Sequence, residues 1–138
     1  MKFFLSFEPD IPTLTHQNGV KPHVVNGHAS MHKTPELRRY EAELVAKLVR
    51  FRPDEPMKKV RLSTMWYFNR GRHRPGWKTT KPDTDNLVKT LKDCMTTAGF
   101  WDDDSSVVLE HIGKRWADDG EPHGIFVEAH EMKGTENG

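Results

Sequence analysis

The sequence predicts a small α+β domain in which two main helices pack on a mixed β-sheet. Its 138 residues are enough for one hydrophobic core but not for two. Residues 60–68 alternate apolar and polar side chains, which is typical of a half-buried strand, whereas residues 34–50 and 84–98 repeat apolar side chains at helical spacing. We therefore expect a single domain over residues 1–138, with the order strand, loop, helix, strand, helix, strand, strand.

The chain begins with a short strand. Phe3, Leu5 and Phe7 lie at every second position, and Pro9 ends the pattern. Residues 13–33 follow neither a strand period nor a helix period and contain two Asn-Gly pairs, so we expect a long loop or a loosely formed hairpin there. Loops of this length in a compact domain are often functional or disordered.

The first helix is expected to begin after Thr34, which is a favoured N-cap residue. Pro35 at the first helical position and Glu36 in the first turn are further start signals. The helix should end near Arg50, before Pro53. One apolar face runs along it, formed by Leu37, Tyr40, Leu44, Val45 and Leu48. We expect this face to pack in the core, and a subunit interface is the alternative.

The second helix follows the strand at residues 60–68. Either Thr84 or Asp85 caps its start, Gly99 ends it, and Phe100 is placed to pack on the C-cap. Its apolar face consists of Leu87, Leu91, Cys94, Met95 and Ala98. The remaining segments are expected to be two strands and a frayed tail, over residues 107–114, 124–130 and 133–138.

Cysteine usage and the N-terminus indicate the compartment. The single cysteine, Cys94, excludes an intramolecular disulfide framework and a zinc site with several thiolates, and a reducing cytoplasm permits this usage. Glu8 and Asp10 interrupt the N-terminal apolar run before it reaches the length of a signal peptide. No segment approaches the length of a membrane span. We expect a soluble cytoplasmic protein without a membrane partner.

The charges are balanced overall but unevenly distributed. There are 21 Lys and Arg against 20 Asp and Glu, so net charge alone gives no reason to expect nucleic-acid binding. Residues 57–82, however, contain eight basic residues and no acidic one. Five of them lie in or beside a Gly- and Pro-rich loop and are candidate phosphate contacts, namely Arg70, Arg72, Arg74, Lys78 and Lys81. The alternative for the basic positions of the strand is an ordinary solvated face.

Six aspartates lie within residues 81–108. Asp83 and Asp85 stand at the entrance of the second helix, where the helix dipole favours their charge, and an extended backbone would aim both side chains the same way. Lys89 follows Asp85 by one helical turn, and a triplet of aspartates, 102–104, follows the helix. Carboxylates without nearby histidine or thiolate suit Mg²⁺ or Mn²⁺ rather than zinc. The alternative is that these aspartates serve only as caps and turn residues.

These residues form a longer pattern that resembles a known family. Residues 82–89 read PDTDNLVK, and Asp93, Ala98-Gly99, an aromatic pair at 100–101 and Asp103-Asp104-Ser105-x-Val107 follow at fixed spacing. The chain resembles the RusA-like Holliday junction resolvases, which are small endodeoxyribonucleases frequent in phages. The pattern covers about a fifth of the chain.

The resemblance implies roles for individual residues. Asp83, Asp85 and Asp104 correspond to the catalytic, metal-holding acids, and Lys89 corresponds to an essential lysine. Because the later acids form a triplet here, Asp103 remains an alternative to Asp104 as the third metal ligand. The resemblance also implies a homodimer, because two symmetric nicks are needed to resolve a four-way junction.

The leading hypothesis is therefore a Mg²⁺-dependent endonuclease that cleaves branched DNA, with Mn²⁺ as a possible substitute. A binding protein for branched DNA without catalysis is the main alternative, and a divalent-metal nucleotide transferase is a third. For the histidine-containing segment 13–33, a polar loop is expected, and a contact with the junction or a second metal site are alternatives. Trp77 and Trp101 are candidates for stacking on an unpaired base, although core packing is expected for Trp101.

Overall fold

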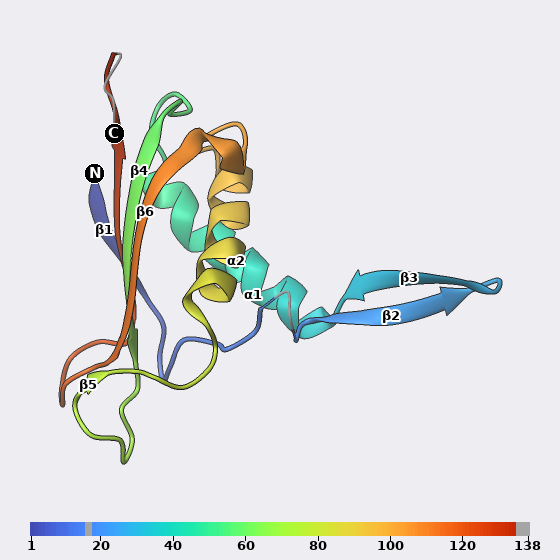
Figure 1. Ribbon diagram of the computed structural model, residues 1–138, viewed down its shortest axis with the longest axis horizontal. Coiled ribbons are helices and arrows are strands. Elements are labelled where there is room, and N and C mark those ends of the chain that lie inside the picture. The colour runs from blue at the N-terminus through green and yellow to red at the C-terminus, as the bar shows by residue number, and fades with distance from the viewer. Residues whose placement is uncertain (16–17, 135–138) are drawn as a thin grey trace.

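The computed structural model describes residues 1–15 and 18–134 (Figure 1). One sheet contains five strands in the order β1-β7-β4-β6-β5. Their bounds are Lys2–Ser6 for β1, Val60–Phe68 for β4, Gly76–Trp77 for β5, Val107–Trp116 for β6 and Gly124–Glu131 for β7. Strands β4 and β6 are parallel and the other neighbours are antiparallel, so the sheet is mixed. Helices α1 (Pro35–Leu48) and α2 (Thr84–Ala98) lie on one face of it. The predicted α+β class is confirmed.

Helix α2 lies where the topology requires a crossover. Parallel strands such as β4 and β6 cannot be joined by a tight turn, and the chain between them runs through β5 and α2. Alternate residues of β4, from Val60 to Phe68, are buried toward the helices, as the period-two pattern predicted. The crossover places the start of α2 at one end of the sheet and its C-terminus at the other, beside the short 3₁₀ helix η2 (Asp104–Ser106).

Both helices use the predicted start and stop signals, with one correction. The Thr34 hydroxyl accepts a hydrogen bond from the Leu37 amide at 3.3 Å, and Pro35 occupies the first turn of α1. A 3₁₀ turn, η1 (Val49–Phe51), follows the helix. For α2 the N-cap is Asp83 and not Thr84 or Asp85. The predicted N-cap lay one or two residues too far along the chain. The backbone of Asp83 is still extended, whereas Thr84 is the first residue of the helix. Gly99, in the left-handed conformation with φ of 97°, ends α2.

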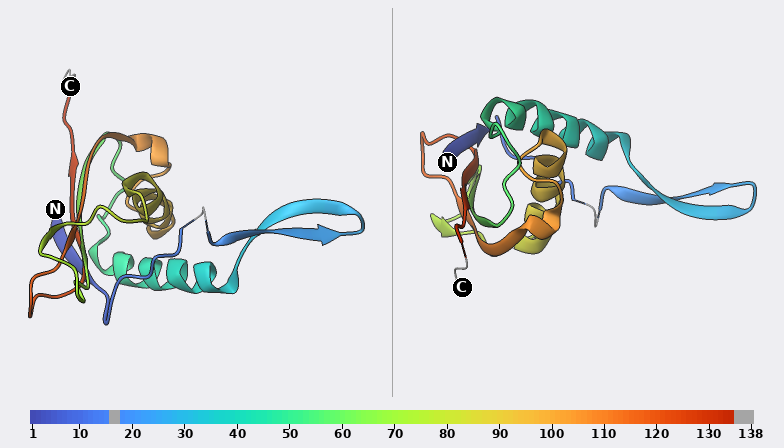
Figure 2. Two further views of the ribbon diagram at one scale, coloured as in Figure 1. Left: turned by 60° about the horizontal axis from the view of Figure 1, so that its bottom comes forward. Right: turned by 90° about the horizontal axis from the view of Figure 1, so that it is seen from above.

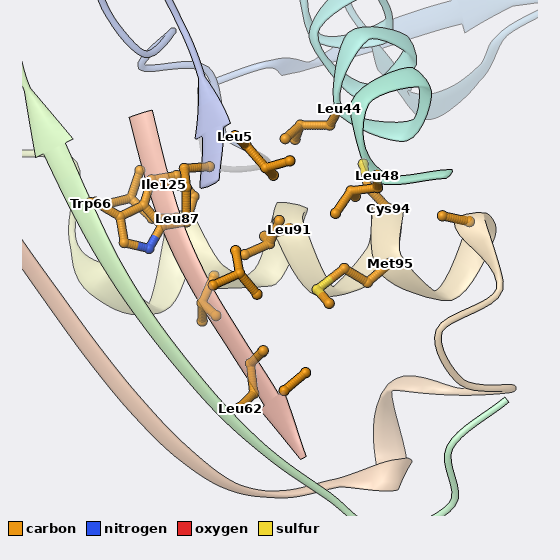
Figure 3. Packing of buried hydrophobic residues seen from close by; sticks show 14 of the residues in the cluster. Leu5, Leu44, Leu48, Leu62, Trp66, Leu87, Leu91, Cys94, Met95 and Ile125 are labelled. Carbon is orange, nitrogen blue, oxygen red and sulfur yellow. The ribbon is translucent and has the colours of Figure 1, made fainter. Parts of the chain in front are cut away.

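The core lies between the sheet and the two helices (Figure 3). Four of the five predicted apolar residues of α1 are buried, as are all five of α2. Core packing is therefore confirmed for the α1 face, with the exception of Val45, which is only partly buried. Phe100 and Trp101 are buried as well, at 0% and 1% exposure, so Trp101 packs in the core and cannot stack on a base. Among the described helices, none is long and apolar enough to cross a membrane.

For residues 20–33 the sequence allowed either a loop or a hairpin. These residues form an antiparallel hairpin of β2 (Val20–Val25) and β3 (His28–Lys33). We call it the arm. It points away from the rest of the molecule (Figure 2). The Thr34 amide donates to the Gly19 carbonyl at 2.7 Å and thus fixes the base of the arm. Residues 16–17 of the predicted loop and residues 135–138 of the predicted tail lie outside the described part of the chain.

Candidate active site

Two carboxylates stand at the N-terminus of α2. Asp83 holds the N-cap position, yet its carboxylate accepts no capping hydrogen bond from the described helix backbone. Asp85 lies in the first turn, and both residues are exposed. The positive end of the helix dipole lies beside them and stabilises their negative charge. Both carboxylates therefore present oxygen atoms at the surface, and oxygen is the type of ligand that hard divalent cations prefer.

The segment before this acid pair is held by two lysines. The Lys114 ammonium, from β6, donates to the carbonyls of Thr80 at 2.6 Å and Pro82 at 2.7 Å. The Lys78 ammonium donates to the Thr80 hydroxyl at 2.5 Å and to the Lys81 carbonyl at 2.9 Å. Three successive residues immediately before Asp83 are thus hydrogen-bonded to ammonium groups. We call Lys78 and Lys114 the lysine clamp, and it fixes the backbone from which the acid pair projects.

The burial of Lys78 corrects a prediction. Its side chain is only 7% exposed, and its ammonium lies 4.5 Å from the ring centroid of Trp116 and 5.2 Å from that of Phe68. Burial lowers the pKa of Lys78, and the neighbouring Lys114 ammonium lowers it further. A side chain in this position cannot contact DNA phosphates. The sequence pattern counted it among the basic loop residues because alternation in a short irregular segment does not reveal which side chain turns inward.

The other four candidate phosphate contacts differ in exposure. Arg72, Arg74 and Lys81 are exposed, and the first two lie in the loop between β4 and β5. Arg70 is partly buried and forms a 2.7 Å ion pair with the exposed Asp119. The exposed candidates are therefore Arg72, Arg74 and Lys81, of which Lys81 lies two residues before Asp83, and Arg70 would have to exchange its carboxylate partner for a phosphate.

Lys89 lies one turn beyond Asp85 on α2, as predicted. Its side chain is 58% exposed, and its ammonium is 3.7 Å from the Asp93 carboxylate, one turn further along. The pair is a solvent-exposed contact of the kind that contributes little to stability. Lys89 is therefore available to move toward an anionic ligand at the helix.

Asp104 lies at the opposite end of α2. Its carboxylate accepts a hydrogen bond from the Thr96 hydroxyl at 2.5 Å, and Thr96 in turn accepts one from the Trp101 indole at 2.8 Å. Burial by itself would raise the pKa of Asp104, but hydrogen bonds with Asp93, Thr96 and Trp101 and the Lys92 ammonium outweigh it, so the pKa is lowered. Asp104 is therefore ionised at neutral pH.

Asp103, the alternative third ligand, has a different environment. Its carboxylate accepts a hydrogen bond from the Ser105 amide at 3.0 Å and so caps η2. Hydrogen bonds from Ser105 lower its pKa. The side chain is exposed and has a local structural use, whereas Asp104 is directed back toward α2. Asp102, the remaining member of the triplet, is also exposed.

The predicted acids do not all meet within one chain. Asp85 and Thr96 are eleven residues apart on α2, which corresponds to about 16 Å along a helix. Because Asp104 is bound to Thr96, it lies at the far end of α2 from Asp83 and Asp85. Over residues 1–15 and 18–134, no three His, Cys, Asp or Glu side chains come close enough to hold a metal ion. The chain thus presents a carboxylate pair at one end of α2 and a separate ionised carboxylate at the other.

A hollow of ≈ 400 Å³ lies beside the start of α2. Thr84, Trp77, His111 and Lys114 are among its lining residues. The Trp77 ring is 65% exposed, and the Arg115 guanidinium lies 5.6 Å from its centroid. Trp77 can be recognised from the sequence, but Lys114 and Thr96 cannot, because a single lysine in a strand and a single threonine in a helix give no signal of their partners.

Comparison with known proteins identifies the family. The sequence model of the family described as Endodeoxyribonuclease RusA matches residues 12–128. The chain belongs to the RusA family. It is 34% identical over 114 residues to a protein of Lactococcus phage r1t described as a crossover junction endodeoxyribonuclease rusA, and the match covers 78% of this chain and 84% of that protein. The resemblance inferred from the spaced acidic pattern is confirmed, and the chain is an enzyme of the endonuclease class.

Substitution of Lys114 tests the lysine clamp. Lys114→Met keeps the aliphatic stem but removes two charge-assisted hydrogen bonds, so we expect a loss of about 1–2 kcal/mol in the free energy of unfolding, measured in urea. If the acid pair is catalytic, its displacement should also lower kcat for DNA cleavage by about 100-fold, because small misplacements of catalytic groups are costly.

The exposed Lys58, at the other end of the sheet, provides the matched control. Lys58→Met should leave both quantities unchanged. If Lys114→Met weakened DNA binding in proportion to its loss of cleavage, Lys114 would be a DNA contact and not a positioning residue.

Proposed function

We propose that the protein resolves Holliday junctions or other branched DNA by paired symmetric nicks, as a Mg²⁺-dependent homodimeric endonuclease in the cytoplasm of a bacterial host. The observation that carries this proposal is the pair of exposed carboxylates, Asp83 and Asp85, at the start of α2 in a chain of the RusA family. The phage relative is described as a crossover junction endodeoxyribonuclease, which supports the same substrate here.

Asp83 and Asp85 are the proposed first two metal ligands, and Asp104 is the proposed third. The donor set consists of carboxylate oxygens, which suits Mg²⁺ or Mn²⁺. When bound, such an ion activates water and neutralises charge on the scissile phosphodiester. Asp104 is favoured over Asp103 because the part-buried Asp104 carboxylate is directed back toward α2, whereas the exposed Asp103 carboxylate caps η2.

The third carboxylate is proposed to come from a second subunit. Within one chain, Asp104 lies too far along α2 to share an ion with Asp83 and Asp85. In a two-fold dimer whose α2 helices run antiparallel, the N-terminus of each α2 lies beside the C-terminus of the other. Each site would then combine Asp83 and Asp85 of one subunit with Asp104 of its partner. This arrangement explains why the family pattern includes acids from both ends of α2.

Lys89 and the basic loop are proposed to hold the DNA. The Lys89 ammonium is exposed on the same helix as the acid pair and can place positive charge near a phosphate in the transition state. Arg72, Arg74 and Lys81 are exposed next to the segment that leads to Asp83, and Arg70 can join them by leaving Asp119. The exposed Trp77 ring offers a surface on which a base unstacked at the branch point can stack.

A panel of DNA shapes tests the proposed function. We expect the protein with Mg²⁺ to nick four-way junctions at symmetric positions on opposed strands, and to leave linear duplex of the same sequence intact. Mapping the nicks on four-way, three-way, flap and linear substrates measures activity and strand symmetry together. Equal cleavage of linear duplex would contradict junction selectivity.

The same panel separates the alternatives. A binding protein without catalysis would retard the junction in a gel but never nick it, with or without Mg²⁺. A nucleotide transferase would leave all four DNA shapes intact and would bind nucleotides, which isothermal titration detects.

A further inference from the structure

The arm has two chemically different faces. The register of β2 and β3 places five apolar residues on one face of the arm, together with Lys33 at the base: Val20, Pro22, Val24, Ala29 and Met31. The other face carries mostly polar residues, namely Lys21, His23, Val25, His28, Ser30 and His32. Two contacts agree with this division, because the rings of His23 and His32 are 4.8 Å apart and the Ser30 hydroxyl is 2.8 Å from His32 Nε2. We call these the apolar face and the polar face of the arm.

The apolar face is strongly exposed in the single chain. Val24 and Met31 are each 65% exposed, and the arm extends away from the core (Figures 1 and 2). A two-stranded hairpin alone in water is at best marginally stable, and three or more strands or a packing partner are usually needed. The arm is nevertheless regular in structure, so its apolar face requires a covering surface that the single chain does not supply among its described residues.

A surface of matching character lies between α1 and α2. A groove of ≈ 600 Å³ is lined by Ala42, Val45, Ala46, Cys94 and Thr97, with Lys33, Glu41 and Asp93 completing it. A cavity of roughly 150 Å³ already holds a benzene-sized group, so this groove has room for several aliphatic side chains. Val45, the one residue of the α1 apolar pattern that is not fully buried, contributes to it.

Charge favours the same pairing. Residues 11–35, which include the whole arm, contain no Asp or Glu, and the arm carries Lys21 and Lys33. The groove has the carboxylates of Glu41 and Asp93 in its lining. Within the single chain, Lys33 at the base of the arm already forms an ion pair with Glu41 of the groove at 3.0 Å, so charge favours a basic arm at this border only where it adds to that pair.

The arm cannot reach the groove of its own chain. Val24 lies four strand residues beyond Val20, which corresponds to about 13 Å from the base. Both views show the arm pointing away from α1 and α2 (Figure 2). An arm seated in this groove must therefore come from another copy, and in a two-fold dimer the exchange is reciprocal.

We propose that two copies of this chain exchange arms, with the apolar face of each arm seated in the α1–α2 groove of the other. The inference rests on the proposed homodimeric endonuclease and names the surface that forms the dimer. The base of the arm lies close to the acid pair, since Thr15, Asn18, Lys81 and Pro82 line one hollow. The groove contains Asp93, which is hydrogen-bonded to Asp104. An exchanged arm thus connects the acid pair of one subunit with the Asp104 region of its partner, and leaves the polar face directed outward.

Site-specific disulfide formation tests the exchange without DNA or metal. One chain carries Val24→Cys, and a second chain, made larger by a tag, carries Ala46→Cys. Both also carry Cys94→Ala, which removes a buried thiol whose pKa is raised to about 12 by burial. We expect a covalent heterodimer on mild oxidation of the mixture, because a disulfide requires Cα atoms within about 7 Å.

Val25→Cys is the matched control, since Val25 is adjacent to Val24 but on the polar face. It should form no disulfide with Ala46→Cys. Equal cross-linking of both positions, or cross-linking of neither, would overturn the proposal.

A second measurement covers the case in which a variant is misfolded. The double variant Val24→Asp/Met31→Asp changes only exposed arm residues, so the helical circular dichroism signal of α1 and α2 should match that of the wild type while its mass by light scattering falls by half. Ser30→Asp, on the polar face, should stay a dimer. If the double variant stays a dimer but binds junctions less tightly, the apolar face contacts DNA and the arm exchange is wrong. In that case the dimeric endonuclease itself still stands, because cleavage of four-way junctions tests it separately.

Discussion

Replacing Asp85 with asparagine should abolish junction cleavage and leave the fold and junction binding intact. The amide retains the size of the side chain but loses the negative charge that attracts a divalent cation. We expect cleavage with Mg²⁺ to fall by about a thousandfold or more, because several kcal/mol of transition-state stabilisation depend on the ion. Stability should change little, since Asp85 is exposed and a first-turn charge contributes only about 0.3–1 kcal/mol.

Asp102→Asn provides the matched control for Asp85→Asn. Asp102 is also an exposed aspartate, but it belongs to the later triplet and is not a proposed ligand. The control should cleave at the wild-type rate. Both variants should retard a four-way junction equally in a gel without Mg²⁺. Retained cleavage by Asp85→Asn would remove Asp85 from the catalytic assignment.

Much of the fold follows from local chemistry. The hydroxyl cap at Thr34 and the left-handed glycine at Gly99 depend only on residues within a few positions of each helix end, so the local sequence is enough to place them. The period-two pattern of β4 is similarly direct, because every second side chain must face the helices. For the arm, the Asn26-Gly27 pair is the decisive signal: both residues have positive φ, of 53° and 78°, as tight hairpin turns require. The histidines and Pro22 obscured it, since neither is typical of a strand.

The site could be predicted only in part, because its geometry depends on tertiary structure. The spacing of Asp83, Asp85 and Lys89 on one helix follows from helical periodicity. The position of Asp104 does not, because it depends on how the chain turns back after Gly99 to reach Thr96. Lys78 and Lys114 are likewise indistinguishable in sequence from solvated lysines. Only the placement of β6 beside β4 brings Lys114 to the segment before Asp83.

Subunit mixing should reveal whether the acids of one site come from two chains. Asp85→Asn and Asp104→Asn are each expected to be inactive as homodimers. When the two variants are coexpressed and form heterodimers, one site combines both substitutions, and the other combines the intact Asp83 and Asp85 of one chain with the intact Asp104 of its partner. That second site should nick the junction.

Random pairing makes half of the dimers mixed, each with one intact site, so about a quarter of the wild-type sites should be active. The expected products are single nicks, since the opposed strand faces the inactive site. A mixture of Asp83→Asn with Asp85→Asn is the matched control and should stay inactive, because both acids belong to the same end of α2. If the mixture of Asp85→Asn with Asp104→Asn is equally inactive while each variant folds and binds junctions, all three acids act within one chain. The turn at residues 99–106 must then move to bring Asp104 along α2 toward the acid pair.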